Sequence, residues 1–144
     1  MRSLITLTGL IALFLVNSAS AASVSIDPGQ WEMTTTMTMS MMPQPQTTTV
    51  LECIEEDELD PESFNMDEDN PRDITDVTTD GNTARWSISC PTEGGPVMEG
   101  HWEVTSNGDS LTGKGEMTTE MAGQKMGFNM NWQGKRIGKC EKDG

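Results

Sequence analysis

Methionine is the residue type whose number and spacing first suggest chemistry in this sequence. The stretch WEMTTTMTMSMM holds five of the twelve methionines of the chain. Thioether sulfurs favour Cu(I), and an M-x-M strand places successive sulfurs on one face about 7 Å apart. Two strands could therefore bring three sulfurs to one Cu(I) or Ag(I) ion. The candidate ligands are Met37, Met39 and Met41, with Met126 or Met130 on a neighbouring strand.

The same methionines are needed to build the core, and this lowers the metal hypothesis. After residue 21 the chain has nineteen Leu, Ile, Val, Phe and Trp residues beside eleven methionines. Nineteen would make a thin core, because burial must offset about 1 to 2 kcal/mol of backbone entropy per residue. No His or Cys lies within the methionine run to raise its affinity for a metal. We therefore favour no metal site and expect no cofactor.

Catalytic arrangements are also poorly supported. His101 is the only histidine, and alternation along its strand places it on the polar side between Glu99 and Glu103. A Ser–His or Cys–His pair needs its base beside a nucleophile and oriented by a third group. Nothing local in the sequence supplies that arrangement, so the sequence favours a protein that is not an enzyme.

The methionine run has the period of a β-strand. Trp31, Met33, Met37, Met39 and Met41 occupy odd positions, while the even positions carry Glu, Thr and Ser. A two-residue period predicts an amphipathic strand with sulfur on one face and hydroxyls on the other. The MMPQPQ segment follows, and its two prolines are expected to turn the chain and end the pairing before a threonine-rich strand over 47–54.

Alternation continues to the C-terminus. The sequence predicts strands over 74–79 and 83–90 around an Asp-Gly-Asn turn, then over 98–104, over 111–121 and from 126 onward. We expect an all-β antiparallel meander of about seven to eight strands that forms a strongly curved sheet or an open barrel. One short helix is expected near 55–59, within an acidic connection that covers about 52–73.

The apolar positions of these strands define a candidate binding face. A curved sheet with an incompletely covered, methionine-lined concave face would accept an apolar small molecule or a protein partner, because methionine adapts to varied shapes. We favour this binding module over the Cu(I) or Ag(I) alternative. The ligand-face candidates are Trp31, Met33, Met37, Met39, Met117, Met121, Phe128, Met130 and Trp132.

The N-terminus has the features of a secretory signal. A basic Arg2, an apolar run from Leu4 to Val16 and the small residues Ala19-Ser20-Ala21 predict cleavage after Ala21. The apolar run is shorter than the roughly 18 to 20 residues that span a bilayer, so we expect no stable membrane insertion. Residues 22–144 then form a single all-β domain in the periplasm.

The charge of this domain restricts its partners. Without Arg2 it carries 8 basic and 23 acidic residues, a formal charge of −15. Such a field repels phosphate backbones, so we expect no nucleic-acid partner. The sequence does not determine the oligomeric state.

Four segments, taken in order, suggest a family. DPGQWEMTTTMTM, ECIEEDEL, the pattern GN-x-x-x-W-x-x-x-C and the terminal GKRIGKC together resemble the bacterial periplasmic family known as domain of unknown function 3617 (DUF3617). The resemblance covers essentially all of the chain after the signal. It implies a small secreted all-β protein without an assigned activity, and it brings no catalytic residues.

The cysteines depart from that family, whose members commonly have four. This chain has three, and the missing one would fall near Arg72, opposite Cys90 across the predicted hairpin. By elimination we favour a disulfide between Cys53 and Cys140, which leaves Cys90 free as a small apolar side chain. A bond between Cys90 and Cys140 remains the alternative, since an oxidising compartment allows either.

Overall fold

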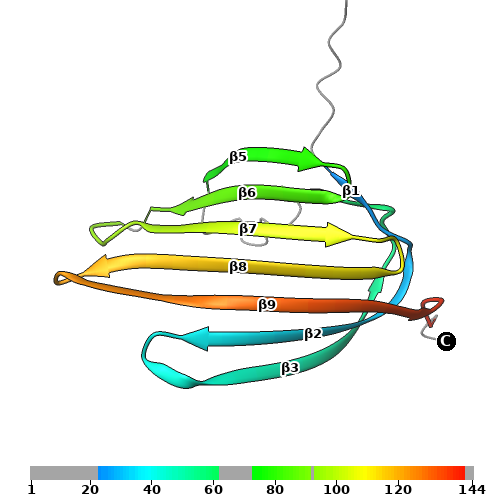
Figure 1. Ribbon diagram of the computed structural model, residues 1–144, viewed down its shortest axis with the longest axis horizontal. Coiled ribbons are helices and arrows are strands. Elements are labelled where there is room, and N and C mark those ends of the chain that lie inside the picture. The colour runs from blue at the N-terminus through cyan, green and yellow to red at the C-terminus, as the bar shows by residue number, and fades with distance from the viewer. Residues whose placement is uncertain (1–22, 62–72, 92, 142–144) are drawn as a thin grey trace, which may run out of the picture.

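The computed structural model describes residues 23–61, 73–91 and 93–141, and in this part of the chain every regular element is a strand (Figure 1). The predicted signal with its cleavage site at Ala21, and Arg72, lie outside the described residues. No helix with the length and apolar character needed to cross a membrane occurs in the described ranges. The strands are β1 Val24–Ser25, β2 Gly29–Met39, β3 Met42–Ile54, β4 Glu58–Leu59, β5 Asp73–Asp80, β6 Thr83–Cys90, β7 Met98–Ser106, β8 Ser110–Met121 and β9 Gln124–Gly138.

Seven of the strands form one open antiparallel sheet in the order β3-β2-β9-β8-β7-β6-β5. The run from β5 to β9 is a meander, and the β2–β3 hairpin joins it by pairing β2 with β9. The predicted all-β antiparallel class and the curved-sheet alternative are thus confirmed, and the sheet does not close into a barrel. β3 and β5 are its two edges (Figure 1).

The predicted helix near 55–59 is wrong. Glu58 and Leu59 form β4, which pairs with Ser25 and Val24 of β1 in a separate two-stranded sheet. The backbone NH of Ile26 also donates to the carbonyl of Asp57 at 2.9 Å. Extended pairing satisfies these backbone groups and lets Leu59 pack against the core, which outweighs the local helical preference of an acidic segment.

The sequence predicts that the prolines of the MMPQPQ segment delay the next strand to residue 47, and this is wrong. The prolines interrupt the pairing, but β3 already begins at Met42. β2 and β3 are joined by a two-residue turn at Ser40 and Met41, and Met42 already pairs with Met39. The register shifts between Met37 and Met39, so that residues 43–45 have no partner on β2. An edge strand tolerates proline in this way because one of its sides bonds to no neighbour.

The core occupies the apolar face along β6, through Ala84, Trp86 and Ile88, and includes the end of the sheet at which β2 begins. β1 and β4 lie over this end (Figure 1) and bury Val24 and Ile26 against the apolar face. Trp31, the first large side chain of β2, is completely buried there, and its indole NH donates to the carbonyl of Asp27 at 3.0 Å. Val104 and Leu111 complete the covered region.

The disulfide predicted between Cys53 and Cys140 is confirmed, and Cys90 is free. Cys53 lies at the end of β3 and Cys140 just beyond the end of β9, and these two strands flank the start of β2. The bond therefore fastens the β2–β3 hairpin to the C-terminal strand. It closes a sequence separation of 87 residues, a length for which chain entropy suggests about 4.5 kcal/mol of stabilisation.

Glycines on the apolar side of the central strands make room for large side chains to lie flat. A Cβ at Gly113 would overlap the ring of Trp132, and one at Gly115 would overlap the ring of Trp102. The two tryptophan rings contact each other with centroids 5.4 Å apart. The glycines are thus part of the packing, because the sheet surface beneath the rings has no room for a methyl group.

We expect Gly113→Ala to destabilise the protein by roughly 1 to 3 kcal/mol, because the added methyl group must displace the Trp132 ring. The matched control is Gly138→Ala at the end of β9, where an added Cβ meets nothing within 4 Å. Its effect should stay within about 0.5 kcal/mol. Urea unfolding followed by tryptophan fluorescence measures both, and equal effects would contradict the packing role of Gly113.

Candidate functional site

The strand register brings most of the predicted ligand-face residues onto one side of β8, β9 and β2. Met37 pairs with Met130, and Met39 pairs with Phe128. Phe128 in turn pairs with Met117, while Trp132 lies between Thr35 and Gly113. Met33 reaches over Gly134, where it meets Trp31. The alternation read from the sequence therefore corresponds to a continuous apolar face.

Burial decreases along β2 on this face, whereas Met117 of β8 stays buried in the row of Phe128 and Met39. Trp31 has no exposed surface and Met117 is buried, whereas Met33, Met37, Phe128, Met130 and Trp132 are half-buried. At the hairpin end Met39 is 36 %, Met42 41 % and Met121 48 % exposed. We call this end the methionine tip, which consists of Met37, Met39, Met42, Met121, Met126, Phe128 and Met130.

Met41 does not share the face on which its odd position would place it. It lies in the turn between β2 and β3 and is 78 % exposed. The strand ends at Met39, so the alternation no longer applies beyond it. Met42, which breaks the sequence pattern, takes the place beside Met39. Four of the candidate metal ligands therefore share the apolar face, and Met41 does not. The four are Met37, Met39, Met126 and Met130.

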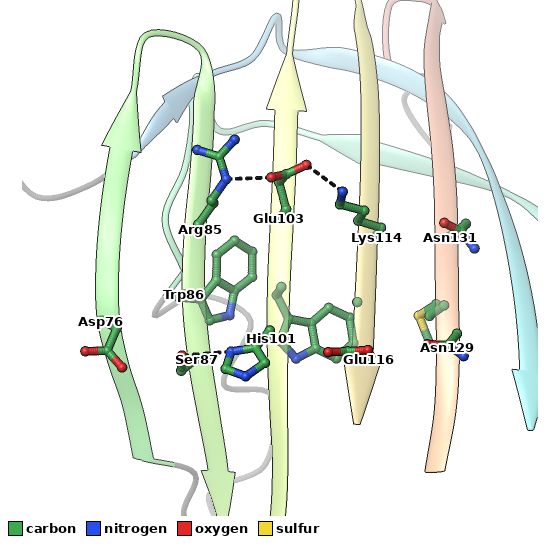
Figure 2. A pocket seen from close by; sticks show the side chains of 13 residues that line it. Asp76, Arg85, Trp86, Ser87, His101, Glu103, Lys114, Glu116, Asn129 and Asn131 are labelled. Carbon is green, nitrogen blue, oxygen red and sulfur yellow. Dashed lines mark hydrogen bonds and ion pairs between the residues drawn. The ribbon is translucent and has the colours of Figure 1, made fainter. Parts of the chain in front are cut away.

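The opposite face of the sheet carries a polar hollow of about 560 Å³ that the sequence did not reveal (Figure 2). It extends across β5 to β9, and Trp86, Trp102 and Met130 also contribute to its lining. Its polar lining consists of Asp76, Arg85, Ser87, His101, Glu103, Lys114, Glu116, Asn129 and Asn131. Its only signal in the sequence is that β6, β7, β8 and β9 each carry two polar residues at alternate positions. The strand register aligns these residues across the sheet. The hollow thus lies on the polar face, and the expectation of a methionine-lined recess does not describe it.

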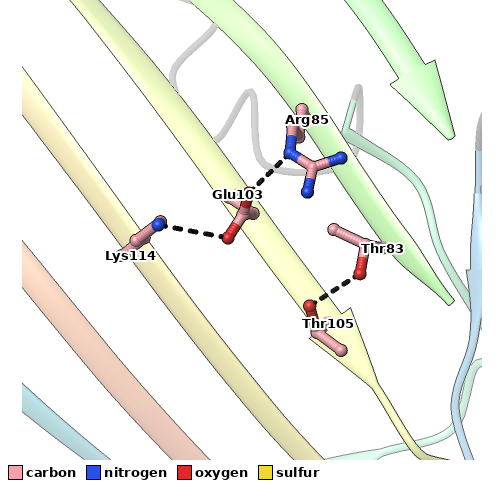
Figure 3. Close-up of polar contacts among 5 residues, drawn as sticks. All are labelled: Thr83, Arg85, Glu103, Thr105 and Lys114. Atoms are coloured by element: carbon pink, nitrogen blue, oxygen red, sulfur yellow. Dashed lines mark hydrogen bonds and ion pairs between the residues drawn. The ribbon is translucent and has the colours of Figure 1, made fainter. Parts of the chain in front are cut away.

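Glu103 is the charged centre of this hollow (Figure 3). Its carboxylate accepts from Arg85 Nε at 2.5 Å and lies 3.4 Å from Lys114 Nζ. The hydrogen bond from Arg85 lowers the pKa of the Glu103 carboxyl below its ordinary value, and Lys114 adds to this while desolvation opposes it. The row of three charges ties β6, β7 and β8 together on the polar face.

His101 lies in the same hollow (Figure 2). Its Nδ1 is 3.1 Å from Ser87 Oγ, because the two residues are register partners on β6 and β7. His101 is exposed, and within the described part of the chain its Nε2 makes no hydrogen bond. A histidine that activates a serine is normally oriented through its second nitrogen by an acidic group. The pair as it stands lacks that orientation.

The described residues contain no group of three or more His, Cys, Asp or Glu side chains arranged to hold a metal ion. Cys90 is half-buried at the end of β6, opposite Met98. The register also brings two thioethers of the methionine tip together, those of Met37 and Met130.

Comparison with known proteins gives one match. A family model described as protein of unknown function (DUF3617) matches residues 26–140. No curated protein and no solved structure matches the chain. The matched range includes the apolar face, the polar hollow and both disulfide cysteines.

We expect Glu103→Gln to lower the free energy of unfolding at pH 7 by less than about 1 kcal/mol, since Arg85 and Lys114 are exposed and Glu103 is partly exposed, so that solvent screens both ion pairs. The native-state pKa of Glu103 is lowered, so its contribution is complete above the ordinary value of 4.5 and is lost as the pH falls through the native-state pKa. The difference between the variant and the wild type should therefore shrink at about pH 3.

Glu99→Gln is the control, because it removes the same charge from the same face of β7 without touching the ion pairs. Urea unfolding at both pH values and in high salt measures the two variants. A Glu103→Gln effect that is equal to that of Glu99→Gln at neutral pH would contradict a stabilising role for the charge row.

Proposed function

This chain belongs to the DUF3617 family, and we propose that it is a secreted, non-enzymatic binding module that takes an apolar ligand or an apolar segment of a protein partner on its methionine tip. The exposure of Met39, Met42 and Met121 carries this proposal. Contiguous exposed apolar side chains on a folded protein commonly mark a binding surface, whereas isolated ones need no explanation.

The covered end of the sheet shows what a complete cover would look like. There β1 and β4 hide the apolar face, and Trp31 and Val104 are almost fully buried. At the tip the same face continues with half-buried and exposed side chains. The proposed ligand would occupy the place at the tip that β1 and β4 occupy at the other end.

The composition of the tip suits an adaptable contact. Methionine side chains are flexible and polarizable, so one set of them can pack against apolar groups of different shape. Residues 33–46 carry no charged side chain in a chain of formal charge −14. The part of the tip on β2 and β3 therefore offers no charge for an ionic contact, which suits an uncharged ligand.

Secretion to the periplasm through a signal cleaved after Ala21 is part of the proposal. The disulfide between Cys53 and Cys140 supports it, because disulfides persist in oxidising compartments and are rare in the cytosol. The mass of the protein purified from its native compartment is the check, since an uncleaved chain would contradict this part.

We expect Met39→Gln and Met121→Gln to weaken the binding of a hydrophobic fluorescent dye several-fold, because an amide replaces an exposed thioether of similar length. Met41→Gln is the matched control, since Met41 is more exposed but lies in the turn and not on the apolar face. Dye titration with each variant provides the measurement. Equal binding by the wild type and all three variants would argue that the tip is not the binding surface.

The alternative function is Cu(I) or Ag(I) binding by the thioethers of Met37, Met39, Met126 and Met130. The observation that favours it is the pairing of Met37 with Met130 across β2 and β9. The double variant Met37→Leu/Met130→Leu separates the two functions, because it removes two sulfurs but keeps an apolar surface.

We expect a Cu(I) titration against a chromophoric chelator to show no difference between this double variant and the wild type, and dye binding to persist in both. Cu(I) affinity that is present in the wild type and lost in the Leu variant would instead establish the metal as the ligand.

A further inference from the structure

The two edges of the sheet are protected to very different degrees. The β5 edge carries Asp73, Asp76 and Asp80, and its register with β6 shifts between Thr75 and Thr78. Asp76 has a positive φ of 54° within that irregularity. Charged side chains and bulges are the usual means by which proteins prevent strands from pairing at an edge. The β5 edge is therefore closed to a partner strand.

The β3 edge lacks this protection over residues 46–52. Every side chain in that window is exposed, including Val50 at 50 % and Leu51 at 63 %. Glu52 is its only charged residue. The two prolines of β3 lie before the window, and Cys53, which is held by the disulfide, directly follows it. An exposed edge strand with a single charge at one end of the window is a template for another strand.

We propose that this edge pairs with β3 of a second copy of the chain, antiparallel and with the two-fold axis at Thr49. The window between Pro45 and Cys53 is centred on Thr49. A C2 interface is self-complementary, so a free window that pairs over its full length with itself must have the axis at its centre. The result is one continuous sheet through two copies, independent of the methionine tip.

The side chains of the window fit this register. Gln46 of one copy faces Glu52 of the second copy, so the two carboxylates do not oppose each other. Thr48 faces Val50 of the second copy on the apolar side, and Thr47 faces Leu51 of the second copy on the other side. The most exposed apolar side chains of the strand gain a cross-strand neighbour. In this register the even-numbered residues of β3 in one copy face the even-numbered residues of β3 in the second copy. The apolar faces of the two copies therefore lie on the same side of the joined sheet.

Net charge opposes this association and gives it a recognisable salt dependence. Each copy carries a formal charge of −14. The repulsion acts between exposed charges over distances that salt screens, whereas the backbone pairing at the window is uncharged. Association through this edge should therefore strengthen as salt is raised, which is opposite to an interface held by ion pairs.

Sedimentation velocity of the purified protein over about a hundredfold range of concentration tests the proposal. We expect a monomer–dimer equilibrium that shifts toward dimer in high salt. Thr49→Lys and Thr49→Glu each place two like charges across the axis, and each should raise the dissociation constant more than about tenfold. An equimolar mixture of the two variants should restore dimer, because opposite charges then meet at residue 49.

Gln44→Lys is the matched control, since it changes the charge of the same strand outside the window and should leave dimerisation at its wild-type level. Far-ultraviolet circular dichroism verifies that each variant keeps its sheet. A wild type that stays monomeric at every concentration and salt level would overturn the proposal. Dimerisation that both Thr49 variants leave unchanged would overturn it as well.

Discussion

A single sheet with one apolar face has to be covered, and among the described residues β1 and β4 cover the end of it at which β2 begins. The cover is the pair β1 and β4, which backbone hydrogen bonds hold in place: Ile26 donates to Asp57, and Asp27 donates to Gly108. The buried hydroxyl of Ser106 adds a bond to the carbonyl of Ser25. Because polar backbone groups must find partners when they are buried, these bonds allow a short extended segment to lie over Val104 and Leu111.

The remainder of the apolar face depends on its own side chains. Trp102 and Trp132 lie flat over glycines and contact each other, and Met117 lies over Gly100 in the same way. Because a large side chain lies over each of these glycines, the apolar surface at the centre of the sheet is densely packed. This arrangement extends only as far as β8 and β9 have neighbours, so the side chains at the hairpin ends remain exposed.

Strand positions and tight turns could be predicted from the sequence, because they follow from alternation and turn residues. Features that depend on pairing between distant segments were missed. The alternation around Trp86 and Trp102 placed their strands correctly, and the Asp80-Gly81-Asn82 turn lies where it was expected. The helix near 55–59 failed because the pairing of Leu59 with Val24 joins segments distant in sequence. The polar hollow was missed for a similar reason, since Ser87 and His101 become neighbours only through the register of β6 and β7.

The β2–β3 hairpin combines the two features that distinguish this fold from a simple meander. It carries the exposed Met39 and Met42 at its turn, and it supplies the less protected edge of the sheet. On the polar face paired hydroxyls, Thr34 with Thr49 and Thr36 with Thr47, stiffen it along its length. At its base the disulfide between Cys53 and Cys140 fixes it to β9. A hairpin held so firmly at one end can present apolar side chains such as Met39 and Met42 at the other without losing its register.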